Sequence, residues 1–101
     1  MLDKLQASDF NLHLNETFRV HLDAFGVEPI ELELVHIAEA GPGSRPEARP
    51  PFSIQFLGPL SSQYLVQHIY PLEHASLGRL DLFLVPLGPE SGRMRYEAIF
   101  A

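Results

Sequence analysis

The sequence predicts an all-β, mainly antiparallel domain: a small six-stranded barrel or two-sheet roll with one short N-terminal helix. Six segments are strand-like. Most of them alternate between apolar and polar residues, which is the period of half-buried strands, whereas 80–85 is apolar on both faces and is expected to be covered on both sides or to lie at an interface. All but one of their connections are short, and short connections join antiparallel neighbours, because a parallel crossover needs about a dozen or more residues. The chain has 101 residues, of which 46% are hydrophobic and 20% charged, so we expect a single domain over 1–101 with one core.

The helix is predicted within residues 7–14. Ser8 or Asp9 is a suitable N-cap, and Phe10 and Leu14 stand four residues apart on one helix face. A helix of one or two turns is marginal alone and must pack on another element. We therefore expect it to close one open end of the barrel.

The strands follow in order, separated by turns predicted at 25–29 and 88–92. The alternation changes phase at Leu34 and Val35, which predicts a bulge there. Pro71 lacks an N–H group and must lie at an edge or a bulge. The strands are predicted at 18–22, 30–34, 52–56, 64–73, 80–85 and 96–100, and the core is predicted to include Phe18, Leu32, Phe56, Leu82 and Phe100.

Residues 40–50 are predicted to form a mobile loop. They hold three of the nine prolines and two of the seven glycines, together with two arginines and no large apolar residue.

Composition excludes several classes of protein. The 7 Lys+Arg against 13 Asp+Glu give a net charge of −6, so no nucleic-acid partner is expected, because such a partner needs a basic surface. There is no cysteine, which excludes disulfides, iron–sulfur clusters and thiol catalysis. The apolar runs are too short for a membrane helix, and no segment has the order of a signal peptide, so we expect no membrane association and a cytoplasmic protein.

One stretch carries a family resemblance. The residues Tyr-Pro-Leu-Glu-His-Ala-Ser-Leu-Gly at 70–78 and Leu-Phe-Leu-Val-Pro at 82–86 resemble the Glu-His-Pro-x-Leu-Gly and Leu-Phe-Leu-Val-Pro motifs of a small bacterial family of unknown function. Ala75 stands where that family usually has proline. The resemblance implies a bacterial, cytoplasmic, all-β protein of no stated activity. It also suggests an association with phage-tail-like proteins, and hence a structural or assembly role.

The Glu73-His74-Ala75-Ser76 segment suggests a catalytic set with His74 as base and Ser76 as nucleophile. Neighbours on a strand point to opposite faces, however, so Glu73 and His74 cannot serve one site. We therefore expect a structural turn, in which His74 binds backbone groups, Leu77 packs inward and Gly78 adopts a positive φ.

A metal site is the alternative use of the histidines. His21 and Asp23 share one strand face, and His36 could face them from the next strand. Such spacing arises often by chance, so we expect solvated residues, no bound metal and no cofactor.

Apolar residues on the outward face of the last two strands predict an interaction surface at Phe83, Val85 and Ile99. The N-terminal helix is expected to cover it; otherwise another chain does. Acidic residues around the second strand add a candidate docking surface for a basic partner or, more simply, a solvated face. These acidic residues are Glu28, Glu31 and Glu33.

From these features we expect a non-enzymatic binding or structural module whose partner is another protein, in a monomer or a weak homo-oligomer. The alternative is a barrel that holds an apolar small molecule in its interior. The candidate ligand contacts are Phe18, Phe52, Phe56 and Tyr96.

Overall fold

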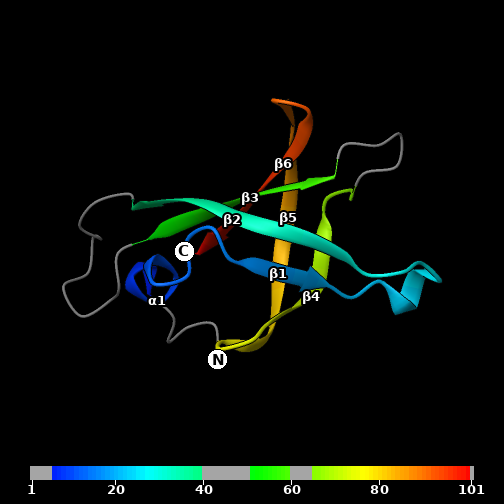
Figure 1. Ribbon diagram of the computed structural model, residues 1–101, viewed down its shortest axis with the longest axis horizontal. Coiled ribbons are helices and arrows are strands. Elements are labelled where there is room, and N and C mark those ends of the chain that lie inside the picture. Colours follow the sequence, from blue (N-terminus) through cyan, green and yellow to red (C-terminus); the bar gives the residue numbers. More distant parts are fainter. Residues whose placement is uncertain (1–5, 40–50, 60–64, 101) are drawn as a thin grey trace.

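The computed structural model describes residues 6–39, 51–59 and 65–100, and it confirms a closed six-stranded barrel with one short helix (Figure 1). Every neighbouring pair is antiparallel, in the order β1-β2-β3-β6-β5-β4, with β4 returning to β1. The predicted loop at 40–50 lies outside the described residues. The elements are α1 (Ala7–Asn11), β1 (Thr17–Val20), a 3-10 turn η2 (Asp23–Phe25), β2 (Ile30–Glu39), β3 (Phe52–Pro59), β4 (His68–His74), β5 (Gly78–Glu90) and β6 (Arg93–Phe100).

The core fills the interior of the barrel. All five predicted core residues are buried, which confirms the inward face assigned to their strands. The aromatic rings pack directly on one another: the centroids of Phe18 and Phe56 lie 5.3 Å apart, and Phe52 stacks on Phe100 at 4.5 Å. These rings include three of the four candidate ligand contacts, so the packing gives no support to a ligand among them.

The helix α1 lies at one end of the barrel (Figure 1). Its N-cap is Gln6 rather than Ser8 or Asp9, and the Asp9 carboxylate accepts the Gln6 N–H at 2.8 Å in a capping box. Phe10 is fully buried, with its ring 5.9 Å from Phe52 and 5.4 Å from Phe100. A five-residue helix is thus fixed by one aromatic side chain inserted into the barrel.

The helix does not cover the predicted surface, so that expectation is wrong. Phe83 remains 47% exposed and Ile99 67% exposed. The physical reason is that the buried helix side chains, Ala7 and Phe10, join the barrel core instead of the outer wall.

Two irregularities fall where the sequence places them. The β2–β3 register shifts between Leu34 and His36, leaving Val35 as the extra residue of a bulge. Pro71 stands inside β4 at the level where β1 has ended, and its carbonyl accepts the N–H of His21 at 2.9 Å. The residue that lacks an N–H therefore lies where the β1–β4 ladder ends, beside His21.

The turn predicted at 88–92 is shorter than expected. β5 continues to Glu90, and only Ser91 and Gly92 turn the chain, with φ of 54° and 78°. Two positive φ angles match the tight hairpin turn that suits twisted strands. The prolines of β5 are accommodated by a bulge between Pro86 and Gly88.

Candidate functional site

His74 is the last residue of β4, directly before the turn to β5. Its side chain is buried, and its Nδ1 accepts the backbone N–H groups of Ser76 at 3.0 Å and Leu77 at 3.1 Å. Gly78 completes the turn with φ of 77°. Because Nδ1 accepts two hydrogen bonds, it carries no proton, and the proton of the neutral ring lies on Nε2.

Glu16 joins this histidine to a second one. The Oε1 atom of Glu16 lies 2.8 Å from Nε2 of His74 and 2.9 Å from Nδ1 of His13, and the two imidazole rings are 4.4 Å apart. The hydrogen bond from His74, and secondly that from His13, hold the pKa of Glu16 below its ordinary value. An ionised carboxylate only accepts hydrogen bonds, so both imidazoles donate to it. We call His13, Glu16 and His74 the imidazole clamp.

The imidazole clamp has the side chains of a metal centre, since its three potential ligand atoms lie within 4.8 Å of one another. The His74 tautomer opposes that use. A metal at Nε2 would displace the proton, and Nδ1 cannot take it while two N–H groups point at it. The arrangement favours a structural link between the segment after α1 and the β4–β5 turn.

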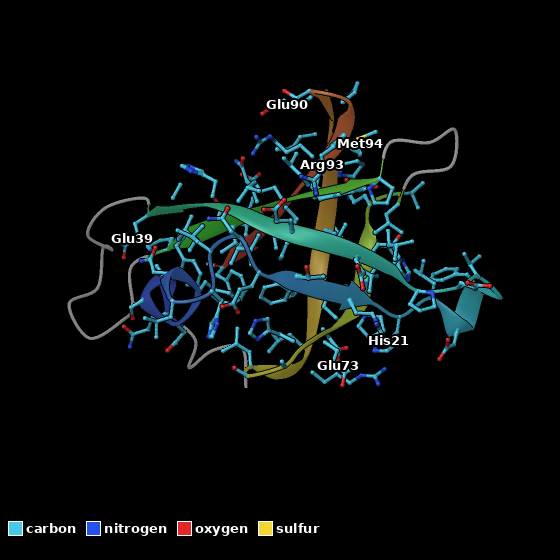
Figure 2. All side chains as sticks on the ribbon, viewed as in Figure 1. His21, Glu39, Glu73, Glu90, Arg93 and Met94 are labelled. Atoms are coloured by element: carbon cyan, nitrogen blue, oxygen red, sulfur yellow. The ribbon has the colours of Figure 1, made fainter. Side chains whose placement is uncertain are left out.

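The residues that were weighed as an alternative metal or catalytic set are not brought together in the structure. His21 Nε2 lies 2.8 Å from Glu73 Oε1. Both side chains are labelled in Figure 2. In the part of the chain that the structure describes, the side chains close enough together to hold a metal are those of the imidazole clamp. His21, Asp23 and His36 form no such group. Glu73 is exposed while His74 is buried, so the two point to opposite faces.

The pKa of Glu16 makes stability depend on pH. A carboxyl whose folded pKa is lowered stabilises the fold above its ordinary pKa of 4.5 and loses that contribution as pH falls through the lower folded value. We expect Glu16→Gln to reduce the loss of unfolding free energy between pH 5 and about pH 3. Urea unfolding at several pH values, with Glu31→Gln as an exposed control, measures this. Equal pH dependence in wild type and Glu16→Gln would contradict it.

The predicted acidic surface is largely neutralised. Arg93 Nη1 lies 2.8 Å from Glu33 Oε1, and Arg19 Nη2 lies 3.6 Å from Glu31 Oε2. Glu28 is exposed and forms no ion pair with another described residue. Arg19 lies on the strand next to Glu31, and Arg93 of β6 reaches Glu33 of β2 across β3, so opposite charges account for two of the three carboxylates.

The outward face of β5 carries an apolar stripe. Phe83 and Leu87 are exposed, Val85 between them is half-buried, and Ile69 of β4 pairs with Phe83 across the ladder and is also exposed. We call Ile69, Phe83, Val85 and Leu87 the β5 stripe. The sequence pattern did not indicate Leu87, because that residue stands next to a predicted turn, nor Ile69, because Pro71 interrupts the alternation of β4.

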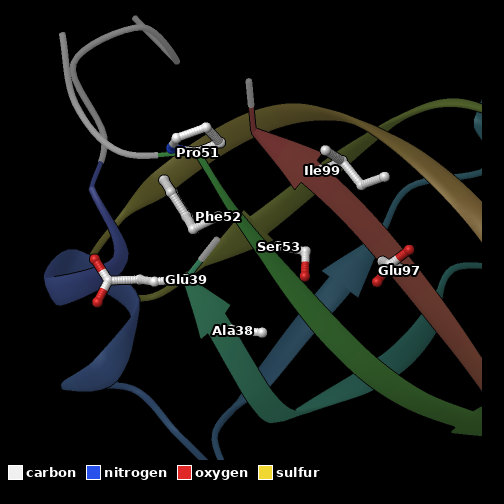
Figure 3. A pocket seen from close by; sticks show the side chains of 7 residues that line it. All are labelled: Ala38, Glu39, Pro51, Phe52, Ser53, Glu97 and Ile99. Carbon is white, nitrogen blue, oxygen red and sulfur yellow. The ribbon is translucent and has the colours of Figure 1, made fainter. Parts of the chain in front are cut away.

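Ile99 lies apart from this ladder. It pairs with Ser53 of β3, which in turn pairs with Ala38 of β2. Together they line a shallow hollow of about 260 Å³ on the outer wall, with Ser53 and Glu97 beside Ile99 (Figure 3). The ladder between β5 and β6 stops at Val85 and Glu97, before it reaches Phe83 or Ile99.

The model of a protein family described as a domain of unknown function (DUF6916) matches residues 5–100. The chain belongs to this family. The DUF6916 match spans the barrel from α1 to β6, including the imidazole clamp and the β5 stripe. No curated protein matches the chain, and no solved structure does. Within the described ranges of this DUF6916 domain, no helix has the length and apolar character needed to span a membrane.

Proposed function

We propose that this protein is a non-enzymatic binding or assembly module, which contacts another protein through the β5 stripe. The observation that carries the proposal is that β5 is apolar on both faces. Leu82 and Leu84 point into the core, while Phe83 and Leu87 stay exposed on the other side. A strand that is apolar on both faces is typical of one covered on both sides.

Charge favours a different chain over a second copy as the partner. Each copy carries a net charge of −6, and exposed Asp81 lies two residues from Phe83 on the same outward face. Like charges across an interface oppose association, and a complementary surface favours it. We therefore expect a partner surface that is apolar with basic residues around it, and a protein that is a monomer or at most a weak homo-oligomer.

The family resemblance suggests the organism, the compartment and the kind of partner for such a module. The motif at 70–86 suggests a bacterial, cytoplasmic protein, and an association with phage-tail-like proteins would use an assembly module of this kind. The alternative of a small-molecule ligand inside the barrel has no packing observation in its favour.

The proposal predicts a specific contact at Phe83. With the photoreactive amino acid p-benzoylphenylalanine at position 83, irradiation of cells of the native host should give one discrete protein adduct, and position 87 should give the same adduct. Ile69→Asp should abolish it because it places a charge within the stripe, whereas Thr17→Asp on β1 should leave it intact. Both substitutions are at exposed positions and should change stability by about 0.5 kcal/mol or less.

Mass spectrometry of the adducts identifies the contact. The same photoreactive amino acid at exposed position 17 of β1 serves as a further control and should not give this adduct. A set of adducts that is the same at positions 83, 87 and 17, or an adduct at 83 that survives Ile69→Asp, would contradict the proposal.

A further inference from the structure

The 3-10 turn η2 lies at the end of the barrel opposite α1 (Figure 1). A second apolar surface lies beside it. It is a hollow of about 240 Å³ between the chain around η2 and the start of β4. We call it the mouth hollow, and it is lined by Leu22, Phe25, Val27, Ile30, Leu65, Val66 and Tyr70.

The floor of the mouth hollow consists of buried residues, and its rim consists of exposed ones. Leu22, Leu65 and Tyr70 are buried, whereas Val66 is 63% exposed and Phe25 53% exposed. The ring of Phe25 packs 6.0 Å from that of Tyr70, so the wall continues into the core. An apolar group that enters would contact a preformed surface.

The polar groups of the floor are already paired. The Tyr70 hydroxyl donates to the Val66 carbonyl at 2.7 Å, and the Leu65 N–H donates to the Tyr96 hydroxyl at 2.9 Å. Burial raises the pKa of Tyr70 above its ordinary value, so the hydroxyl remains a neutral donor. The hollow therefore selects by shape and apolar contact.

Two acidic residues are close neighbours, in the sequence, of residues that line the rim. Asp23 and Glu28 flank the lining residues Phe25 and Val27 in the chain, both are exposed, and neither forms an ion pair with another described residue. The turn that carries them is held by the Val27 N–H, which donates to the Leu22 carbonyl at 3.3 Å. An apolar group next to a positive charge complements this end of the barrel, and an acidic ligand is disfavoured.

We propose that the mouth hollow receives one large apolar side chain of a partner polypeptide, with Lys or Arg next to it in the partner sequence. The volume lies below the roughly 300–1,000 Å³ of small-molecule pockets and suits an anchoring side chain. This inference rests on the proposed function, because it takes a protein as the partner, but it concerns a different face from the β5 stripe.

The experiment is selection from a random octapeptide display library on the full chain. The expected result is enrichment of peptides with an aromatic or large aliphatic residue within two positions of Lys or Arg. The affinity of the best peptide, measured by fluorescence anisotropy, should fall at least tenfold in Val66→Lys and in the double variant Asp23→Lys/Glu28→Lys. Phe83→Lys on the β5 stripe is the matched control and should bind as wild type does. Amide NMR spectra should show peptide-induced shifts at Phe25 and Tyr70 and verify that each variant is folded.

Three outcomes would overturn the inference. These are enriched peptides without basic residues, binding that survives Val66→Lys but not Phe83→Lys, and indole or toluene binding in the hollow while no peptide is enriched. The second would leave the proposed function standing. Peptide binding at the mouth hollow together with no photoadduct at position 83 would overturn the proposed contact at the β5 stripe and support the inference for the mouth hollow.

Discussion

Leu82→Ala is expected to lower the free energy of unfolding by about 2–5 kcal/mol. Leu82 lies on the inward face of β5, is 2% exposed and pairs with Tyr70 of β4. Truncation removes the transfer free energy of the lost groups and leaves a cavity that a closed barrel relaxes into only partly. Because a domain of this size is stabilised by only about 5–15 kcal/mol, the variant should approach the limit of folding.

The neighbouring residue provides the control. Phe83 has a larger side chain than Leu82, but it points outward and is 47% exposed. Phe83→Ala should therefore change stability by about 1 kcal/mol or less, which is the size of a cross-strand side-chain pair. Chemical denaturation of both variants measures the difference. A loss for Phe83→Ala as large as that for Leu82→Ala would show that the stripe is covered within the monomer.

The strands of the barrel could be predicted because the residues within each strand follow a local pattern. In β3 the residues Phe52, Ile54 and Phe56 alternate with polar ones, and the structure buries all three. Period-two alternation fixes which face is inward without knowledge of the strand's partners. The bulge at Val35 was predictable for the same reason, since one extra residue reverses the phase.

The length of β5 could not be predicted in this way. Pro86 and Pro89 interrupt the pattern, and together with Gly88 they are typical of a turn. The structure shows that the strand continues through them, with a bulge between Pro86 and Gly88. Whether a proline ends a strand depends on the hydrogen bonds of the neighbouring strand, which the local sequence does not contain.

The imidazole clamp shows the same limit for side chains. The sequence predicted a turn with His74 bound to backbone groups, because Gly78 and the change of direction are local features. Glu16 and His13 were missed, since Glu16 is 58 residues from His74 in the chain. The one available signal was the i, i+3 spacing of His13 and Glu16, which brings two polar side chains together after a helix. No local pattern indicates that a third residue joins them.

His74→Ala is the second substitution with a large expected effect, a loss of about 2–4 kcal/mol of unfolding free energy. It removes two hydrogen bonds to the turn, one to Glu16, and the packing of the imidazole on Phe18, whose ring centroid lies 4.6 Å away. Each hydrogen bond contributes on the order of 1 kcal/mol, and buried partners that are left unpaired add to the cost.

Two further variants divide this effect between the two nitrogens. The Asn side-chain oxygen occupies the place of Nδ1 and can accept from Ser76 and Leu77, whereas the Gln side-chain amide reaches towards the place of Nε2 and can donate to Glu16. His74→Asn and His74→Gln should therefore each lie between wild type and His74→Ala in stability. The hydrogen bond from His74 is the main cause of the lowered pKa of Glu16, so that pKa should rise towards 4.5 in His74→Ala and His74→Asn and stay lower in His74→Gln. Carbon-13 NMR titration of the Glu16 carboxyl, together with chemical denaturation, measures both effects. If the three variants had equal stability and equal Glu16 pKa values, His74 would not be held through both nitrogens, and the imidazole clamp would be an incidental contact.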